Sequence, residues 1–138
     1  MNFTALTIEA IIEKPIETVW ATWTLPEHIV NWSFAGEDWH CPKATNDLRV
    51  GGTFSSTMAA KDGNMSFDFE GVYSEVVEHE KIAYGLADGR TVSITFEVVE
   101  GGVNVVEVFD AEKENPLEMQ QAGWQMILNR YKTYTESL

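Results

Sequence analysis

Two kinds of apolar pattern divide this chain: short segments in which apolar and polar residues alternate, and one terminal segment with helical spacing. In the terminal segment, 116–136, apolar residues recur three and four positions apart, which is typical of a helix. Asn115 is expected to cap the first turn, and Pro116 suits the first helical position. One face is expected to carry Leu117, Trp124, Ile127, Leu128, Tyr131 and Tyr134, and a second face Met119, Ala122 and Met126. With two apolar faces, the helix is expected to be covered on much of its girth.

The segments before this helix alternate with a period of two residues, as β-strands do when one face is buried. In 65–77 the expected inward residues are Met65, Phe67, Phe69, Gly71 and Tyr73. In 90–100 they are Val92, Ile94, Phe96 and Val98. The expected strands are 3–12, 39–44, 53–60, 65–77, 81–86, 90–100 and 103–110, and the expected short helices are 15–23 and 26–31. Because short turns join consecutive strands, we expect an antiparallel sheet packed on the terminal helix, in one α+β domain, residues 1–138.

Composition adds a strong negative charge to this picture. The 138 residues include 22 acidic and 9 basic side chains, which gives a formal net charge of −13. Nucleic acids and anionic membranes bind basic surfaces, so neither is expected as a partner. The one cysteine, Cys41, excludes an internal disulfide and fits the reducing cytosol, which predicts a cytoplasmic protein. Residues 1–12 lack the basic and apolar regions of a signal peptide, and no stretch has the length of an apolar membrane span.

Motifs for metal, nucleotide or nucleophile chemistry are not found in the sequence. His40 and Cys41 are adjacent in an expected strand and so point to opposite faces, which argues against a zinc site and against a Cys–His nucleophile pair. There is no glycine-rich phosphate loop and no dinucleotide fingerprint. No metal and no cofactor are therefore expected. Asp47 and Arg49 are expected to form an ion pair in the turn before 53–60, or alternatively Arg49 contacts an anionic ligand.

Four segments carry a resemblance to a known family: LPEHIVNW at 25–32, NDLRVGG at 46–52, FDFEGVY at 67–73 and QAGW at 121–124. In this order they resemble the activator of heat-shock protein 90 ATPase homologue family, within the START-like (SRPBCC) helix-grip superfamily. The resemblance implies a curved seven-stranded antiparallel sheet wrapped around the long C-terminal helix, with two short helices after the first strand and an apolar cavity between sheet and helix. It implies no single activity, because the superfamily includes lipid and hormone carriers, aromatase/cyclases and co-chaperone domains.

Aromatic and methionine side chains that face the helix have two interpretations: they fill an ordinary core, or they line a pocket for an apolar ligand. The resemblance favours the pocket. The residues expected there are Trp32, Phe34, Trp39, Phe54, Met58, Phe67, Phe69, Tyr84, Trp124 and Leu128. Gln121 and Gln125 share a helix face with Trp124 and complete the candidate ligand-binding set. The alternative for both amides is a position in water at the edge of the helix.

Glu107 is the candidate with the largest chemical consequence. It shares strand parity with Val103, Val105 and Phe109. If this parity faces inward, burial raises the pKa of the carboxyl, which then acts as an acid or base or binds a polar ligand group. Members of the resembled family usually have an apolar or small residue here. The alternative is a register shifted by one residue, which places Glu107 in solvent.

Three functions are compatible with these residues. The first is non-catalytic binding of a small hydrophobic or aromatic molecule, oriented by Tyr84, Gln121 or Glu107. The second is a protein-interaction module that modulates a chaperone ATPase through the outward residues of 65–77, which are Ser66, Asp68, Glu70 and Ser74. The third is a polyketide cyclase or dehydratase-like enzyme with Glu107 as acid or base. A monomer and a homodimer both fit, since an exposed edge strand allows pairing.

Overall fold

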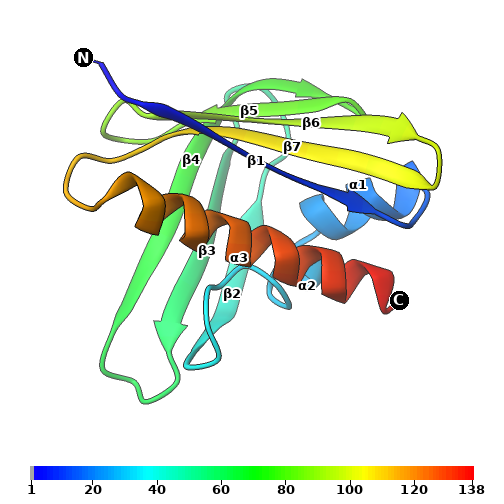
Figure 1. Cartoon of the computed structure of the whole chain (residues 1–138). Helices are drawn as coiled ribbons and strands as arrows, with labels where there is room; N and C mark the ends of the chain where they lie inside the picture. The colour runs from blue at the N-terminus through cyan, green and yellow to red at the C-terminus, as the bar shows by residue number, and fades with distance from the viewer. Residues whose placement is uncertain (1) are drawn as a thin grey trace.

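In the computed structural model, which describes residues 2–138, seven antiparallel strands form one sheet that curls around a long C-terminal helix (Figure 1). The strands are β1 (Ala5–Ile12), β2 (Trp39–Asn46), β3 (Thr53–Ala60), β4 (Ser66–Val77), β5 (Lys81–Gly85), β6 (Thr91–Val99) and β7 (Gly102–Asp110). The helices are α1 (Ile16–Thr24), α2 (Pro26–Ile29) and α3 (Leu117–Glu136). The sheet order β1-β7-β6-β5-β4-β3-β2 is a meander with β1 added beside β7. The expected α+β helix-grip fold is therefore confirmed.

The core lies where β1, β5, β6 and β7 meet α1 and the C-terminal half of α3. Its largest fully buried side chains include Ile12, Ile82, Ile94, Val105, Phe109, Leu128 and Tyr131. The inward parity predicted for 90–100 holds for Val92, Ile94 and Phe96, but the prediction for Val98 is wrong, since this residue is 67% exposed. The reason lies in the register, because β5 begins at Lys81, opposite Thr95, and Val98 extends past its end.

The far end of the β3–β4 hairpin projects beyond the helix (Figure 1). Phe69, Gly71 and Tyr73 face inward as predicted, but Met65 and Phe67 are more than half exposed. Gly71 has a packing role here, because a Cβ at this position would lie 2.7 Å from the ring of Phe54. The missing side chain lets that ring lie against the strand.

The long helix α3 is buried along one stripe only. Leu128, Tyr131 and Thr135 are buried, whereas the predicted second face, which includes Met119 and Met126, is exposed. The expectation that the helix is covered on much of its girth is therefore wrong, because the sheet curls around one side of it. The expected cap is also wrong: Pro116 occupies the N-cap position, and no side-chain hydrogen bond caps the helix there. No helix within residues 2–138 has the length and apolarity needed to cross a membrane.

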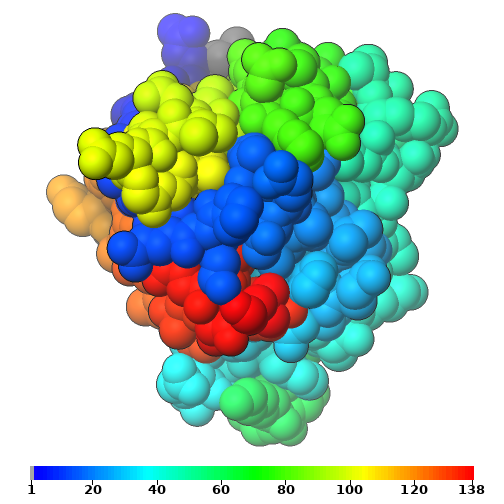
Figure 2. Space-filling model, turned by 90° about the vertical axis from the view of Figure 1, so that its right-hand side faces the viewer, coloured from blue at the N-terminus to red at the C-terminus, as the bar shows by residue number. Residues whose placement is uncertain are grey.

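Hydrogen bonds fix the short helices to α3. The Tyr131 hydroxyl donates to the Val19 carbonyl (2.7 Å) and lies 2.9 Å from the Thr22 hydroxyl, while the Trp32 indole N–H donates to the Thr22 carbonyl (2.9 Å). All of these groups are buried, so each would be costly to leave without a partner. Figure 2 shows the outcome, with the red C-terminal end of α3 packed against the blue segment that contains α1.

A second set of hydrogen bonds joins α1 to the sheet. The Asn46 amide donates to the Thr24 carbonyl (2.7 Å), and its oxygen accepts from the Tyr73 hydroxyl (2.6 Å). One asparagine thus links the end of α1 to β4. These bonds hold α1 and α2 at one end of the sheet. Neither helix fills the space between the sheet and the N-terminal half of α3.

Candidate functional site

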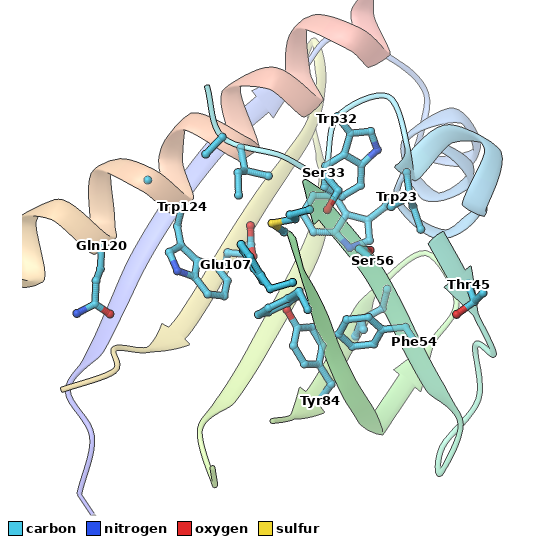
Figure 3. Close-up of a pocket in the computed structure, with 18 of the residues that line it drawn as sticks. Trp23, Trp32, Ser33, Thr45, Phe54, Ser56, Tyr84, Glu107, Gln120 and Trp124 are labelled. Atoms are coloured by element: carbon cyan, nitrogen blue, oxygen red, sulfur yellow. The ribbon is translucent and has the colours of Figure 1, made fainter. Parts of the chain in front are cut away.

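A cavity of about 380 Å³ lies between the N-terminal half of α3 and strands β3, β4 and β5 (Figure 3). Segment 29–35, which begins at the last residue of α2, covers one side of it. Two lining residues, Phe67 on β4 and Met119 on α3, are 51% and 60% exposed. The cavity wall therefore reaches the protein surface at these two residues.

Eight of the candidate residues are brought together in this wall. They are Trp32, Phe54, Met58, Phe67, Phe69, Tyr84, Glu107 and Trp124. Phe54, Phe69 and Tyr84 form mutual ring contacts, with centroid separations of 4.6 to 6.2 Å. Trp124 stacks on Phe109 with the rings 4.1 Å apart and nearly parallel. The wall is therefore built mainly from aromatic rings that hold one another in place.

The two glutamines named with them do not line the cavity. The Gln121 amide donates to the Thr7 carbonyl (3.1 Å), and the Gln125 amide donates to the Glu9 carbonyl (3.4 Å). Both side chains lie along the exposed edge of α3 against β1, which was the alternative position. Placing them in the cavity was wrong. Successive residues of a helix are turned by about 100°, so Gln121 and Gln125 point away from the helix face that lies over β4.

Three further candidates also lie outside the wall. Leu128 is fully buried in the core with Tyr131. The Phe34 ring supports the guanidinium of Arg130, 4.4 Å from the ring centre. Trp39 packs against Phe67, with ring centroids 6.0 Å apart, but is not among the lining residues. Each was assigned from its apolar character, which does not separate core, surface and cavity positions.

The structure adds wall residues that the candidate set did not include, although Tyr73 and Ile127 were expected on the inward faces of their elements. The added residues are Trp23, Ile29, Ser33, Ala35, Thr45, Ser56, Tyr73, Ile82, Asn115, Met119, Gln120, Gly123 and Ile127. Ser56 has the same strand parity as Phe54 and Met58, so strict alternation along β3 would have found it. Ser33 and Ala35 lie in an irregular segment, where no periodic signal exists.

Gly123 leaves the helix side of the cavity open. A Cβ built on it meets no atom within 4 Å. Glycine in the middle of a helix is unfavourable by about 1 kcal/mol relative to alanine. A glycine between Ala122 and Trp124 is therefore a sequence signal that this helix position needs space. The glycine gives the cavity space at the expense of helix stability.

Glu107 faces the interior, as the first of its two interpretations predicted. Register places it between Ile8 of β1 and Ile94 of β6, and it is only 6% exposed. Removal from water raises the pKa of its carboxyl to about 8. Among residues 2–138 no hydrogen bond or ion pair to this carboxyl is found, and its oxygens point into the cavity in Figure 3.

Tyr84 is an ionisable neighbour of Glu107 in the wall. Burial raises the pKa of its phenol well above the usual value, the nearby Glu107 and Tyr73 raise it further, and Arg90 opposes the shift. The Tyr84 hydroxyl is therefore neutral at ordinary pH. Together with Ser33, Thr45, Ser56 and Tyr73, it adds hydroxyl groups to a wall that is mostly apolar.

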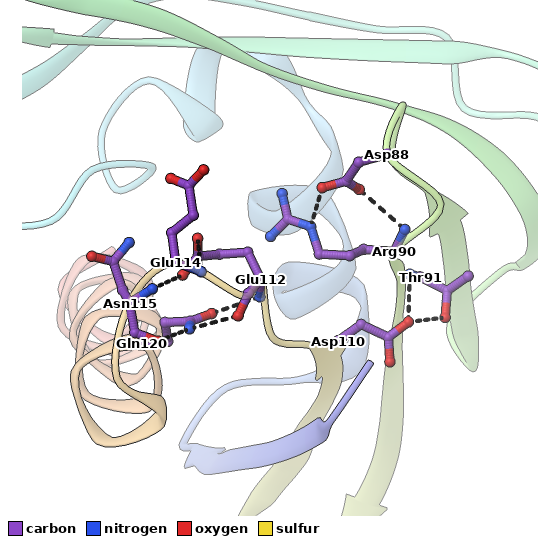
Figure 4. A network of polar contacts seen from close by, with 8 residues as sticks. All are labelled: Asp88, Arg90, Thr91, Asp110, Glu112, Glu114, Asn115 and Gln120. Carbon is purple, nitrogen blue, oxygen red and sulfur yellow. Dashed lines mark hydrogen bonds and ion pairs between the residues drawn. The ribbon is translucent and has the colours of Figure 1, made fainter. Parts of the chain in front are cut away.

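Gln120 frames the cavity at the start of α3 (Figure 4). Its amide oxygen accepts from the Glu112 N–H (2.8 Å), and its NH₂ group donates to the carbonyls of Glu112 (3.0 Å) and Asn115 (2.8 Å). The Glu112 carboxylate accepts in turn from the N–H groups of Glu114 and Asn115. These bonds fix the loop before α3. Elsewhere, the predicted ion pair forms between Arg49 and Asp47 (3.0 Å).

Taken together, the wall can surround an apolar molecule and present one carboxyl and a few hydroxyls to it. Within residues 2–138 no group of three or more His, Cys, Asp or Glu side chains is placed to hold a metal ion. The wall also lacks a nucleophile–base pair among these residues.

Comparison with known proteins gives the family. Residues 13–136 match the family model described as Activator of Hsp90 ATPase homolog 1-like protein. A search of curated proteins found no match.

Several solved structures are similar over almost the whole chain. The AHSA1-like protein from Aeromonas hydrophila is 43% identical, with a TM-score of 0.92 over 97% of this chain and 93% of that one. Chr148 from Cytophaga hutchinsonii is 52% identical, with a TM-score of 0.82 over 95% of this chain and 91% of that one. A protein from Nitrosomonas europaea, 20% identical with a TM-score of 0.84 over 96% and 94%, shares the fold. This chain therefore belongs to the Activator of Hsp90 ATPase homolog 1-like family, on a START-like helix-grip fold.

Proposed function

We propose that this protein binds a small, largely apolar molecule in the cavity between α3 and the sheet, without chemical conversion of it. The observation that carries the proposal is the aromatic cavity of about 380 Å³, which falls within the roughly 300–1,000 Å³ typical of small-molecule sites. Folded interiors are otherwise close-packed, and voids larger than a water molecule are few. A space of this size under a helix glycine is therefore more than a packing defect.

The expected affinity follows from the apolar area that a ligand would bury. A two-ring aromatic molecule that buries roughly 250 Å² gains roughly 6 kcal/mol at about 25 cal/mol per Å². Loss of translational and rotational freedom offsets part of this gain. Affinities in the micromolar to millimolar range are therefore expected for simple apolar probes, and higher affinities for a ligand that also satisfies the polar groups.

A thermal-shift screen against fatty acids, flavonoids, polyketide-like aromatics and sterols tests this function. A ligand at 100 times its dissociation constant stabilises the fold by about 2.7 kcal/mol, which is several degrees for a chain of this size. Gly123→Leu is expected to fill the cavity and abolish the shift. Ala122→Leu adds the same side chain one residue away on the exposed face and is expected to keep it. A shift that survives Gly123→Leu would place binding elsewhere.

The family suggests a second candidate function, modulation of a chaperone ATPase through protein contact. It is supported by the name of the matched family and by the acidic outer face of β4, where Asp68 and Glu70 are exposed. Charge reversal at both positions is expected to abolish binding to an Hsp90-type chaperone in a pull-down, because a basic partner patch would be repelled. Chaperone binding that is unchanged after reversal would remove this candidate.

A further inference from the structure

The cavity wall contains one carboxyl group and, among residues 2–138, no lysine, arginine or histidine. We propose that the cavity selects organic cations: molecules with an aromatic or aliphatic body and a protonated amine that pairs with the Glu107 carboxylate. This inference rests on the proposed function and specifies the charge of the ligand.

The first argument is the unsatisfied state of Glu107. A carboxyl that is 94% buried normally has hydrogen-bond or ion-pair partners, because desolvation of an unpartnered polar group is costly. The part of the chain that the structure describes supplies none to Glu107, and burial accordingly raises the pKa of its carboxyl to about 8. The oxygens are not sealed in the core but open into the cavity (Figure 3). A bound molecule is thus the available partner.

The second argument concerns the sign of the ligand charge. The ionisable neighbour of Glu107 in the wall is the phenol of Tyr84 on β5, which Tyr73 and Arg90 influence in turn, and Arg90 is not a lining residue. Its register partners on the neighbouring strands, Ile8 on β1 and Ile94 on β6, are apolar. An anionic ligand would find no cationic partner in this wall, and its charge would oppose ionisation of Glu107. A cation would supply the missing opposite charge at short range, where low polarity strengthens the attraction.

The third argument is the ring lining. Phe54 and Tyr84 are edge-to-face at 4.6 Å, and Phe69 and Trp124 are edge-to-face at 5.9 Å, so the walls present rings in several orientations. Ring faces attract ammonium groups through the aromatic quadrupole, and cages of this type are used to bind organic cations. The net charge of −13 also favours binding of cations, since it concentrates them near the protein at low salt.

The test uses a matched pair of probes, 2-(1-naphthyl)ethylamine and 2-(1-naphthyl)ethanol, measured by titration calorimetry at pH 7. The two share one aromatic body and differ in the ammonium or hydroxyl group. The amine is expected to bind about tenfold more tightly or better, as a charge-assisted contact does over a neutral one. Binding of the amine is also expected to release close to one proton from Glu107 to the buffer, which is detected by comparing buffers of different ionisation enthalpy.

Two variants locate the effect. Glu107→Gln keeps the shape of the side chain and is expected to lower the affinity for the amine about tenfold, to leave the affinity for the alcohol nearly unchanged and to abolish proton release. Glu97→Gln removes the same charge from the outer face of β6 and is expected to change none of these. Glu107→Met serves as a second variant if the amide impairs folding, which circular dichroism reports.

The outcomes separate the inference from the function on which it rests. An alcohol that binds as tightly as the amine, or a preference for the amine that persists in Glu107→Gln, overturns the inference and leaves the proposed function standing. If neither probe binds, both the inference and the proposed function are overturned.

Discussion

Glu107→Gln provides a quantitative test of the buried acid through the pH dependence of stability. The pKa of this carboxyl is about 8 in the fold against 4.5 in the unfolded chain. Below pH 4.5 the group is protonated in both states and has no pH-dependent effect. Between pH 4.5 and 8 the unfolded chain loses the proton while the fold retains it, so the folding equilibrium weakens about tenfold per pH unit. Above pH 8 both states are ionised, and the effect is constant.

The accumulated difference is roughly 5 kcal/mol between pH 4.5 and 8, a large part of the 5–15 kcal/mol by which domains are usually stable. Glutamine does not titrate, so the variant lacks this loss. The phenol of Tyr84, whose pKa is raised well above its usual value, stays neutral over this range in both proteins. The variant is therefore expected to gain stability over the wild type as the pH rises.

The assay is urea unfolding of both proteins at pH 5, 6, 7, 8 and 9, followed by tryptophan fluorescence. The quantity of interest is the difference in unfolding free energy between variant and wild type, because contributions from other titrating groups cancel in it. It is expected to increase by several kcal/mol from pH 5 to 8 and then to level off. A difference that stays constant with pH would show that Glu107 is solvated and would refute the burial argument.

Three other substitutions test the packing. Gly123→Ala is expected to stabilise the protein by about 1 kcal/mol in thermal unfolding, because the new methyl group meets open space and alanine favours the helix. Gly52→Ala is expected to destabilise it by roughly 2 kcal/mol or more, because the Cβ would collide with the Asp47 carbonyl oxygen. Tyr131→Phe is expected to cost roughly 1–3 kcal/mol in urea unfolding, since it leaves buried partners on α1 without the hydroxyl. Equal effects of the two glycine changes would contradict the packing described for both.

The fold was predictable because period-two and helical patterns record which side of each element is buried. Val92, Ile94 and Phe96 lie on the inward side as their alternation indicated. The pattern failed where an element extends past its neighbours, as at Val98 and Met65, because the length of the adjacent strand or helix decides exposure there. Such ends are set by tertiary packing, which the local sequence does not contain.

The candidate site was predictable in part, for the same reason. Strand residues such as Phe54, Phe69 and Glu107 reached the cavity because their parity fixes their direction. Helix residues were harder, since Gln121 and Gln120 are neighbours in sequence yet face different surroundings. The rotation of α3 about its axis decides which of the two glutamines faces the cavity. Contacts of Tyr131 with α1, far away in the sequence, fix this rotation.

The most direct measurement of the central claim is a ¹H–¹⁵N NMR titration of the wild-type protein with the two naphthyl probes. If a small apolar molecule occupies the cavity, saturable shift changes are expected at the amides of Phe69, Glu107, Gly123 and Trp124, with the outer-face residue Glu97 unaffected. Shift changes confined to the surface, or none at the four wall residues, would contradict the account.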